Sequence, residues 1–355
     1  MRDTIETAIA TPNIAIVKYW GRVKNKYNMP LNSSLGITLD FSLKTRTSVV
    51  FSHKLDRDRV IIDGKDRIAD PNNEKVANLV FVMNKLKKES GVDRGTHGLV
   101  VSQNSFPSDA GLSASSSGGA AFVLAANEAL NLALSKKQLS ILARHISGSA
   151  CRSVYGGIVG WKRTPADGTE ETYGEELFPW DWWPELRDIV VILEEKKKKV
   201  PSSMGHDITP DTSSLYKCRP EYAEQSFEAA LEAIKKRDFD RLGMIIMGES
   251  NSMHATMLDS RPPIFYLNDK SIEIIRASEE MNGESGHIKC AYSFDAGPNP
   301  HLFTTERYRN EVMRMLGGID GVRKIIEVGV GRGPQISDEH LIDDNIRPVL
   351  HHSKS

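Results

Sequence analysis

Hydrophobic and polar positions alternate in several short runs of the first half of the chain, a pattern typical of half-buried β-strands. The alternation is clearest in ITLDFSLKTRTSVVF and predicts a strand region over Ser34–Ser52. Further strands are expected at Thr4–Ala10, Ile14–Tyr19, Val60–Asp63, Gly98–Gln103 and Tyr155–Trp161.

Spacings of three and four residues between apolar positions replace this alternation in three segments and predict helices. The first is Asn73–Ser90, and an alanine-rich helix follows from near Ser113 to about Leu130. Ser135 can cap the third helix. The first half of the chain is therefore expected to be α+β, with strands gathered before helices.

The second half of the chain mixes strands and helices in the same way. Its predicted elements are a strand at Asp188–Leu193, helices at Glu221–Arg237, Phe239–Met253 and Asp269–Met281, a strand at His287–Phe294, a helix near Glu306–Leu316 and a strand at Arg323–Val330. Residues 164–184 are rich in turn-forming residues and contain WDWWP, whose tryptophans we expect to pin a loop rather than bind a partner. We predict an N-terminal lobe over 1–184, a C-terminal lobe over 185–345 and a tail over 346–355.

One polar stretch, SFPSDAGLSASSSGG at Ser105–Gly119, lies between a predicted strand and a predicted helix. Small residues let the backbone approach an anion, and the unpaired N–H groups at a helix start attract negative charge. The stretch is a candidate phosphate loop. From these residues alone, an ordinary Ser/Gly-rich connection is an equally good interpretation.

The composition is that of a folded protein: 355 residues, of which 39% are hydrophobic and 26% charged. A net charge of −1 gives no overall attraction to nucleic acid or to an acidic membrane. The run EEKKKK at Glu194–Lys199 is expected to be a solvated strand end, because its acidic residues cancel the field. Any anion must therefore bind at a local site, which favours small-molecule chemistry.

Cysteine and histidine spacing excludes the common metal motifs. Cys151, Cys218 and Cys290 have no CxxC spacing, and the ten histidines show no HExxH pattern, so we expect neither a disulfide framework nor a metal site. The first residues lack a secretory pattern, and no apolar run approaches about 20 residues. We therefore expect a cytoplasmic protein.

Four further segments place polar groups where an anion could bind. They are NIAIVKYWGR from Asn13, SGSACRS from Ser147, PSSMGHD from Pro201 and FDAGPN from Phe294. Taken singly, Lys18 could be a surface lysine, Arg152 a salt-bridge partner and Asp295 a turn former. Their occurrence together with the candidate phosphate loop favours an enzyme that binds phosphorylated substrates.

With these segments in this order, the chain resembles the diphosphomevalonate decarboxylases of the GHMP kinase superfamily, from about Thr7 to Asp343. The matching blocks are NIAIVKYWGR at Asn13, NSSLGITL at Asn32, NSFPSDAGLSASSSG at Asn104, SGSACRSVYGG at Ser147, SNSMHATMLDSRPPIFYLND at Ser250, AYSFDAGPN at Ala291 and VGRGPQ at Val330. Matching blocks over most of a chain are more specific than any single loop.

The resemblance implies a two-lobed, GHMP-kinase-like α+β fold with the active site in the cleft between the lobes, and a homodimer. It implies a carboxy-lyase of the mevalonate pathway, in isoprenoid biosynthesis. Most members phosphorylate the C3 hydroxyl of a C5-phosphorylated mevalonate with Mg-ATP, then release phosphate and carbon dioxide. A fixed carboxylate would stabilise the positive charge that builds on C3.

The resemblance also implies roles for single residues. Asp295 matches the catalytic aspartate, Lys18 the lysine that holds it ionised and steers the phosphate, and Arg152 the arginine that grips the substrate. The substrate-binding positions are Asn13, Tyr19, Arg22, Ser147, Ser149, Ser202, Ser203, Met204 and Ala296. The phosphate loop, a nucleotide loop if ATP is used, contributes Ser108, Asp109, Gly111, Ser113 and Ser115.

Several positions depart from the family pattern. Asp109 adds a carboxylate to the nucleotide loop, and Ala114 replaces the first serine of its pair. Met204 stands where some members have an arginine, Asp207 adds a carboxylate close by, and Arg22 replaces a lysine. A carboxylate opposes a polyanion, so these changes disfavour ATP and favour a C5 monophosphate.

These departures lead us to expect the archaeal branch of mevalonate 3,5-bisphosphate decarboxylases, which make isopentenyl phosphate with no cofactor. The alternative is an ATP-dependent diphosphomevalonate or phosphomevalonate decarboxylase that uses ATP and Mg²⁺. A superfamily kinase without decarboxylation is more remote, and a non-enzymatic binding protein more remote still. In every enzymatic case the partner is a small phosphorylated mevalonate, not a nucleic acid or a membrane.

Overall fold

The computed structural model describes residues 3–24, 27–68, 73–107, 112–163, 171–193 and 200–349. It has the predicted α+β class, with strands in three sheets. Three expectations lie outside the described residues: the roles of Ser108, Asp109 and Gly111, the solvated run 194–199, and most of the tail 346–355. None of the described helices has the length and apolarity that crossing a membrane requires.

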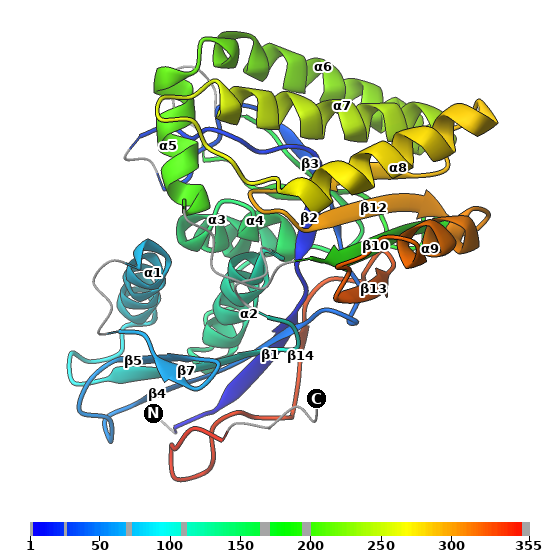
Figure 1. Cartoon of the computed structure of the whole chain (residues 1–355). Helices are drawn as coiled ribbons and strands as arrows, with labels where there is room; N and C mark the ends of the chain where they lie inside the picture. Colours follow the sequence, from blue (N-terminus) through cyan, green and yellow to red (C-terminus); the bar gives the residue numbers. More distant parts are fainter. Residues whose placement is uncertain are drawn as a thin grey trace.

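A six-stranded sheet forms the base of the molecule in Figure 1, in the order β14-β1-β4-β7-β5-β6. Its strands are β1 (Glu6–Ala10), β4 (Thr45–Ser52), β5 (Arg59–Ile62), β6 (Lys65–Asp66), β7 (His97–Asn104) and β14 (Gln335–Ile336). Helices α1 (Glu74–Ser90), α2 (Ala114–Ala129) and α3 (Lys136–Ile146) lie above it. Asn73 caps α1, and Ser135 and Gln138 form a capping box at α3, as the sequence predicts for Ser135.

A second sheet has four strands in the order β2-β3-β8-β9. Its strands are β2 (Asn13–Val17), β3 (Ser34–Thr38), β8 (Ile158–Trp161) and β9 (Gly174–Phe178), and the short helix α4 (Ala150–Ser153) precedes β8. Both β2 and β3 are buried along their whole length. Residues that follow β2 are therefore held firmly, and Lys18 is the first of them.

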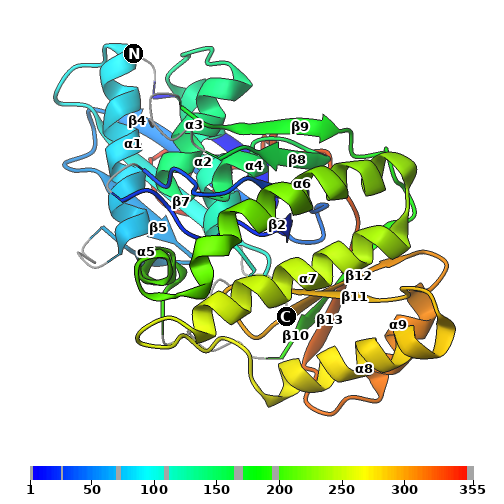
Figure 2. The same cartoon turned by 90° about the horizontal axis from the view of Figure 1, so that it is seen from above.

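The third sheet, β11-β12-β10-β13, belongs to the later half of the chain. Its strands are β10 (Leu186–Ile192), β11 (Ala291–Phe294), β12 (Pro300–Thr305) and β13 (Lys324–Val328). Helices α7 (Phe239–Leu258) and α8 (Asp269–Ser285) lie over it in Figure 2, with α9 (Arg309–Gly317) beside them. Helix α6 (Arg219–Lys236) packs along α7, and α5 (Ser202–Thr212) also contacts α7.

The single strand region predicted over Ser34–Ser52 is wrong, because β3 and β4 lie in different sheets. The chain turns between them at Asp40, whose carboxylate accepts hydrogen bonds from the backbone N–H groups of Ser42 and Gly329. The alternation continues through the turn because Leu39 and Leu43 are both buried. Periodicity alone therefore could not locate the break.

Helix α5 was not predicted, because PSSMGHD was treated only as a polar segment. Its Pro210 lies inside the helix, which a sequence-based prediction would take as a helix end. Gly205 is required by close packing: a Cβ there would lie 2.6 Å from the Trp20 ring. Trp20 thus fixes α5 beside the end of β2.

The loop that contains the three tryptophans is pinned in part. Trp183 is buried, and the Trp182 indole N–H donates to the carbonyl of Ile234 at 3.1 Å. Trp180 is 39% exposed and lies under the guanidinium of Arg332. Two of the three rings therefore anchor the loop as predicted, and the third reaches the surface.

Candidate active site

An ion pair between Lys18 and Asp295 joins the second and third sheets. Lys18 follows β2 and Asp295 follows β11, and Lys18 Nζ donates to Asp295 Oδ1 at 2.7 Å. The lysine side chain is 1% exposed, whereas that of Asp295 is 28% exposed. The carboxylate is therefore open to a ligand on one side and fixed by a cation on the other.

Burial and charge act in opposite directions on this pair. Burial raises the pKa of Asp295, but the charge and hydrogen bond of Lys18, with help from His301 and Arg152, bring it below its ordinary value. Burial lowers the pKa of Lys18, and Asp295 offsets part of that effect. Asp295 is thus an ionised carboxylate across the neutral pH range.

The backbone of Lys18 is held by a second, fully buried ion pair. Glu249 Oε2 accepts from the Lys18 backbone N–H at 2.9 Å, and Arg219 Nη2 donates to the Lys18 carbonyl at 3.1 Å. Arg219 Nη2 and Glu249 Oε2 are 2.6 Å apart, and both side chains are 0% exposed. Helices α6 and α7 therefore position the lysine, and no sequence motif had indicated either residue.

Arg152 lies on α4 with its guanidinium buried against β2 and β3. Its Nε donates to Asn13 Oδ1 at 2.9 Å, and its Nη1 donates to Ser34 Oγ at 2.6 Å. A Cβ at Gly36 would lie 2.9 Å from Arg152 Nε, so the glycine makes room for the guanidinium. Burial lowers the pKa of Arg152. Asn13 therefore positions Arg152 in this structure.

Tyr19 packs over the segment that contains Ser147 and Ser149. Its ring lies 4.6 Å from that of Trp161 and 4.3 Å from that of His206. A Cβ at Gly148 would lie 2.6 Å from the Tyr19 ring. Burial raises the pKa of the Tyr19 phenol, so the hydroxyl stays neutral. The two serines are half-buried beside it.

A lysine that sequence analysis missed contacts the described part of the phosphate loop. Lys75, on α1, donates from Nζ to Ser115 Oγ at 2.7 Å, and Ser115 Oγ lies 3.2 Å from Ser147 Oγ. Ser113, just before α2, has φ 54° and no side-chain cap bond. A helix start with an adjacent lysine and two hydroxyls is suited to phosphate oxygens. Only the position of Lys75, two residues after a capping asparagine, could have suggested this.

Arg22 is already bound by carboxylates. Its Nε and Nη2 donate to the two oxygens of Asp207, each at 2.7 Å, and its Nη1 donates to Glu74 Oε1 at 2.8 Å and to Asn28 Oδ1 at 2.7 Å. The pairing of Asp207 with Arg22 was not predicted from the sequence. The charge of Arg22 is neutralised from both α5 and α1.

The remaining predicted substrate-binding residues are Ser202, Ser203, Met204 and Ala296, and no hydrogen bond between described residues joins their side chains to one another. Ser202 and Ser203 begin α5 and are half-buried, and Met204 is 48% exposed. Ala296 is buried among Trp20 and Tyr266. The described residues contain no group of three or more His, Cys, Asp or Glu side chains that could hold a metal ion.

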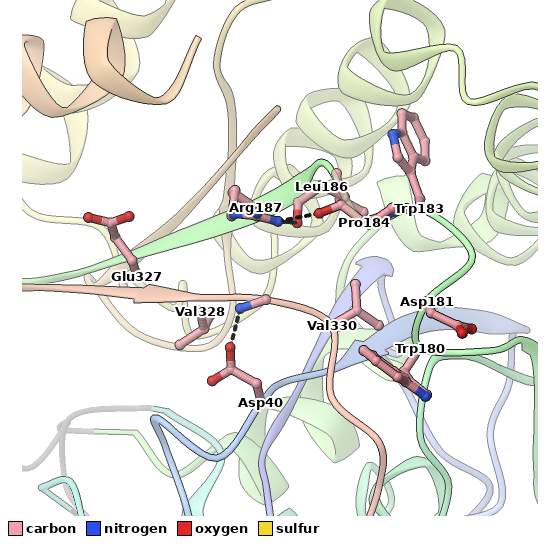
Figure 3. Close-up of a pocket in the computed structure, with 11 residues that line it drawn as sticks. Asp40, Trp180, Asp181, Trp183, Pro184, Leu186, Arg187, Glu327, Val328 and Val330 are labelled. Atoms are coloured by element: carbon pink, nitrogen blue, oxygen red, sulfur yellow. Dashed lines mark hydrogen bonds between the residues drawn. The ribbon is translucent and has the colours of Figure 1, made fainter. Parts of the chain in front are cut away.

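A pocket elsewhere contains none of the predicted site residues. It has a volume of about 370 Å³ and lies between the tryptophan-containing loop and β13 (Figure 3). Asp40 lines it and is hydrogen-bonded to the backbone of Gly329, as drawn in Figure 3. Arg187 and Glu327, which also line it, are paired with Glu306 and Arg309. The pocket is separate from the Lys18–Asp295 pair.

Comparisons with known families identify the family of this chain. Residues 10–172 match the family model described as the diphosphomevalonate decarboxylase-like N-terminal domain. Residues 188–319 match the mevalonate 5-diphosphate decarboxylase C-terminal domain. The chain belongs to the diphosphomevalonate decarboxylase family. It is a carboxy-lyase that acts on phosphorylated mevalonate.

Curated decarboxylases align over nearly the whole chain. The diphosphomevalonate decarboxylase of Debaryomyces hansenii is 34% identical and covers 97% of this chain and 98% of its own. That of Saccharomyces cerevisiae is 34% identical and covers 96% and 98%. Both relatives are eukaryotic, so these matches give no support to the archaeal bisphosphate branch.

Solved decarboxylase structures share the fold and correct the expectation about cofactors. One, described as MDDEF in complex with MVAPP, AMPPCP and magnesium, has a TM-score of 0.84 at 32% identity and covers 94% of this chain and 98% of its own. Mevalonate diphosphate decarboxylase from Staphylococcus aureus also gives 0.84 at 32%, covering 94% and 99%. A third concerns ATP binding by the Enterococcus faecalis enzyme. The expectation of an enzyme without a nucleotide, which rested on Asp109 and Ala114, is therefore wrong.

Proposed function

We propose that this decarboxylase converts 5-diphosphomevalonate with Mg-ATP into isopentenyl diphosphate, ADP, phosphate and carbon dioxide. The observation that carries the proposal is the Lys18–Asp295 pair, a partly open carboxylate held ionised by a buried cation. The family match and the relatives with ATP and AMPPCP in their descriptions support the nucleotide.

A cluster of described residues fits the phosphates of a nucleoside triphosphate. Lys75 lies at the start of α2, where helix N–H groups and the hydroxyls of Ser115 and Ser147 are close together. These groups would hold phosphate oxygens. Mg²⁺ is commonly bound through substrate phosphates rather than by a protein cage, which agrees with the lack of an acidic cluster among the described residues. ATP supplies the phosphoryl group that turns the C3 hydroxyl into a good leaving group.

The chain's own residues account for the chemistry at C3. Asp295 would orient the C3 hydroxyl, accept its proton, and later face the positive charge that develops on C3. Lys18 keeps this carboxylate charged and would attract the departing phosphate. Arg152, with its guanidinium fixed by Asn13 and Ser34, would hold the substrate carboxylate.

A C5 monophosphate is the second candidate substrate, and the Arg22 contacts favour it. The guanidinium already has carboxylate partners, Asp207 and Glu74, so it offers little positive charge to a diphosphate. A diphosphate would have to displace Asp207 from Arg22. A monophosphate carries less negative charge and needs less positive charge from Arg22.

The test supplies three substrates and follows carbon dioxide. We expect release from 5-diphosphomevalonate with Mg-ATP, and slower release from 5-phosphomevalonate with Mg-ATP. Release from mevalonate 3,5-bisphosphate alone, with none from the other two, would overturn the proposal. Faster turnover of the monophosphate would establish the second candidate. Sedimentation velocity on the same sample tests the homodimer that the family resemblance implies.

A further inference from the structure

A row of polar side chains, here called the Asp188 row, crosses the third sheet to Asp295. It consists of Asp188 on β10, His301 on β12, Ser293 on β11 and Asp295 after β11. Register pairs His301 with Ser293 and pairs Asp188 with Phe303, two positions from His301. Asp295 follows two positions after Ser293. Because side chains alternate along a strand, the row lies on one face of the sheet.

That face is turned away from helix α7. The intervening residues Tyr292 and Phe294 contact α7, through a hydrogen bond from Asn251 and ring contact with His254. The row residues Asp188, His301 and Ser293 are 3%, 4% and 0% exposed. The row is therefore a buried polar path that leads from the interior to the partly open carboxylate of Asp295.

Hydrogen bonding in the row is incomplete. His301 Nδ1 and Asp188 Oδ2 are 2.7 Å apart, and an ionised carboxylate can only accept, so the proton lies on Nδ1. Asp188 Oδ1 and Ser293 Oγ are buried without a partner among the described residues. Buried polar atoms normally have a partner, which an ordered water can supply. An Asp–His pair in this tautomer leaves Nε2 as a proton acceptor.

The Asp188 row offers a binding place for a proton that Asp295 alone does not retain. The C3 hydroxyl must lose a proton when it attacks ATP. Asp295 has a pKa below its ordinary value, so it does not retain that proton. The neighbouring His254 is a poor acceptor too, because burial lowers its pKa to about 4. His301 has the carboxylate of Asp188 against its Nδ1, so its Nε2 faces away from that partner.

We propose that the Asp188–His301 pair stores the proton of the C3 hydroxyl, receiving it from Asp295 through Ser293 or an ordered water. The proposal rests on the proposed function. As the C3 oxygen bonds to the γ-phosphorus and the bond from that phosphorus to ADP breaks, the proton passes by Asp295 to His301 Nε2. Later the C3–O bond breaks and its electron pair leaves with the phosphate. The bond between C2 and the carboxylate carbon then breaks, and its electron pair forms the new C–C double bond as carbon dioxide leaves. The stored proton returns to an oxygen of the released phosphate.

Charges of both signs face the pair from four elements. Asp188 on β10 and Asp295 after β11 favour a protonated imidazole. Lys18 after β2 and Arg152 on α4 add positive charge beside Asp295, at the other end of the row. Charges of both signs therefore lie along the row. A permanently charged lysine at this position could not take up the proton.

The test replaces His301 by asparagine, whose amide N–H can keep the bond to Asp188 while Nε2 is lost. We expect the single-turnover rate of ADP formation to fall about 100-fold, with KM for both substrates within twofold. The wild-type rate should rise with pH between about 5 and 8, and this limb should disappear in His301→Asn. Ser293→Ala leaves the pair intact and should lower the rate less while keeping the limb.

His287→Gln is the matched control, because His287 forms the same kind of pair with Asp240, at 2.9 Å, on the surface. It should change neither rate nor profile. An unchanged rate in His301→Asn, or a loss that is uniform in pH, would overturn the proposal.

Nitrogen NMR of the substrate-free protein separates this proposal from the proposed function. His301 should show a protonated Nδ1, and Asp188→Asn should change that tautomer. If wild-type protein releases no carbon dioxide with Mg-ATP, the proposed function fails. If turnover is normal but His301 lacks the Nδ1 proton, the stored-proton proposal alone fails.

Discussion

At the scale of single residues, the chemistry depends on a carboxylate that stays charged beside a buried lysine. The motifs that contain Lys18 and Asp295 predicted their association, and the 2.7 Å contact agrees with it. Glu249 and Arg219, which fix the lysine backbone, belong to no recognisable pattern. A buried pair between distant helices depends on tertiary packing, so single-sequence reasoning could not identify it.

Replacing Asp295 by asparagine tests the carboxylate directly. The amide can still accept a hydrogen bond from Lys18 but cannot balance its charge or the charge that develops on C3. We expect carbon dioxide release to fall at least about 1,000-fold while the circular dichroism spectrum is unchanged. Asp240→Asn, at a surface carboxylate, is the control. Residual activity above a tenth of wild type would remove Asp295 from the chemistry.

Adding one methyl group near Arg152 tests how closely the guanidinium must be held. In Gly36→Ala the new Cβ would lie 2.9 Å from Arg152 Nε and 3.0 Å from the carbonyl of Ile14. The guanidinium must move, so KM for the mevalonate substrate should rise several-fold in steady-state assays. Gly118→Ala, where no atom lies within 4 Å, should leave KM unchanged.

At the scale of elements, α5 controls the charge near the predicted C5 site. The sequence predicted neither the pairing of Asp207 with Arg22 nor the helix that creates it, because Pro210 inside α5 indicates a helix end. The strand split at Asp40 was missed for a related reason: tertiary hydrogen bonds to Gly329 decided it. Local periodicity predicted α1 well because this helix buries one stripe of apolar side chains.

Asp207→Asn should release Arg22 from its strongest partner. Glu74 would remain, yet the guanidinium would gain positive charge available to a ligand. We expect KM for 5-diphosphomevalonate to fall relative to that for 5-phosphomevalonate, by about threefold to tenfold. Asp211→Asn, which removes a more exposed carboxylate of the same helix paired with Lys24, should not change the ratio. An equal change in both KM values would contradict the specificity argument.

His145, at the end of α3, should make stability depend on pH. Burial, with Arg144 and Lys85, lowers its pKa to about 3 from 6.5. Below pH 6.5 His145 binds a proton in the unfolded chain but stays neutral in the folded protein. The free energy of unfolding therefore falls as the pH drops toward 3. His145→Phe keeps a ring against Tyr27, 4.7 Å away in the native protein. Urea unfolding at pH 5 should show a gain of about 1 kcal/mol, absent at pH 8.

At the scale of the whole molecule, the predicted lobes share a core. The largest apolar cluster includes Ile14 and Leu35 from the second sheet and Ile189 and Phe303 from the third. The division at 184 therefore remains a prediction about sequence organisation, and it gave no indication of this shared packing. The α+β class could be predicted from the sequence because it depends only on which segments form helices and which form strands.

The buried Arg219–Glu249 pair should be costly to break. Glu249→Gln leaves a fully buried guanidinium with less compensation, so the free energy of unfolding should fall by about 3 kcal/mol in urea titrations. The double variant Arg219→Met with Glu249→Gln removes the stranded charge and should recover part of the loss. A double variant less stable than Glu249→Gln alone would contradict this account.

The pairing of β14 with β1 affects how the protein is made. Ala8 and Ile9 of β1 lie opposite Ile336 and Gln335, and Leu341 is buried among residues of the first sheet. During synthesis on the ribosome, β1 emerges long before its partner. The edge of β1 that pairs with β14 therefore stays without its partner strand until β14 has been translated. Chaperones that protect nascent strand edges should matter more for this protein than its α+β class alone would suggest.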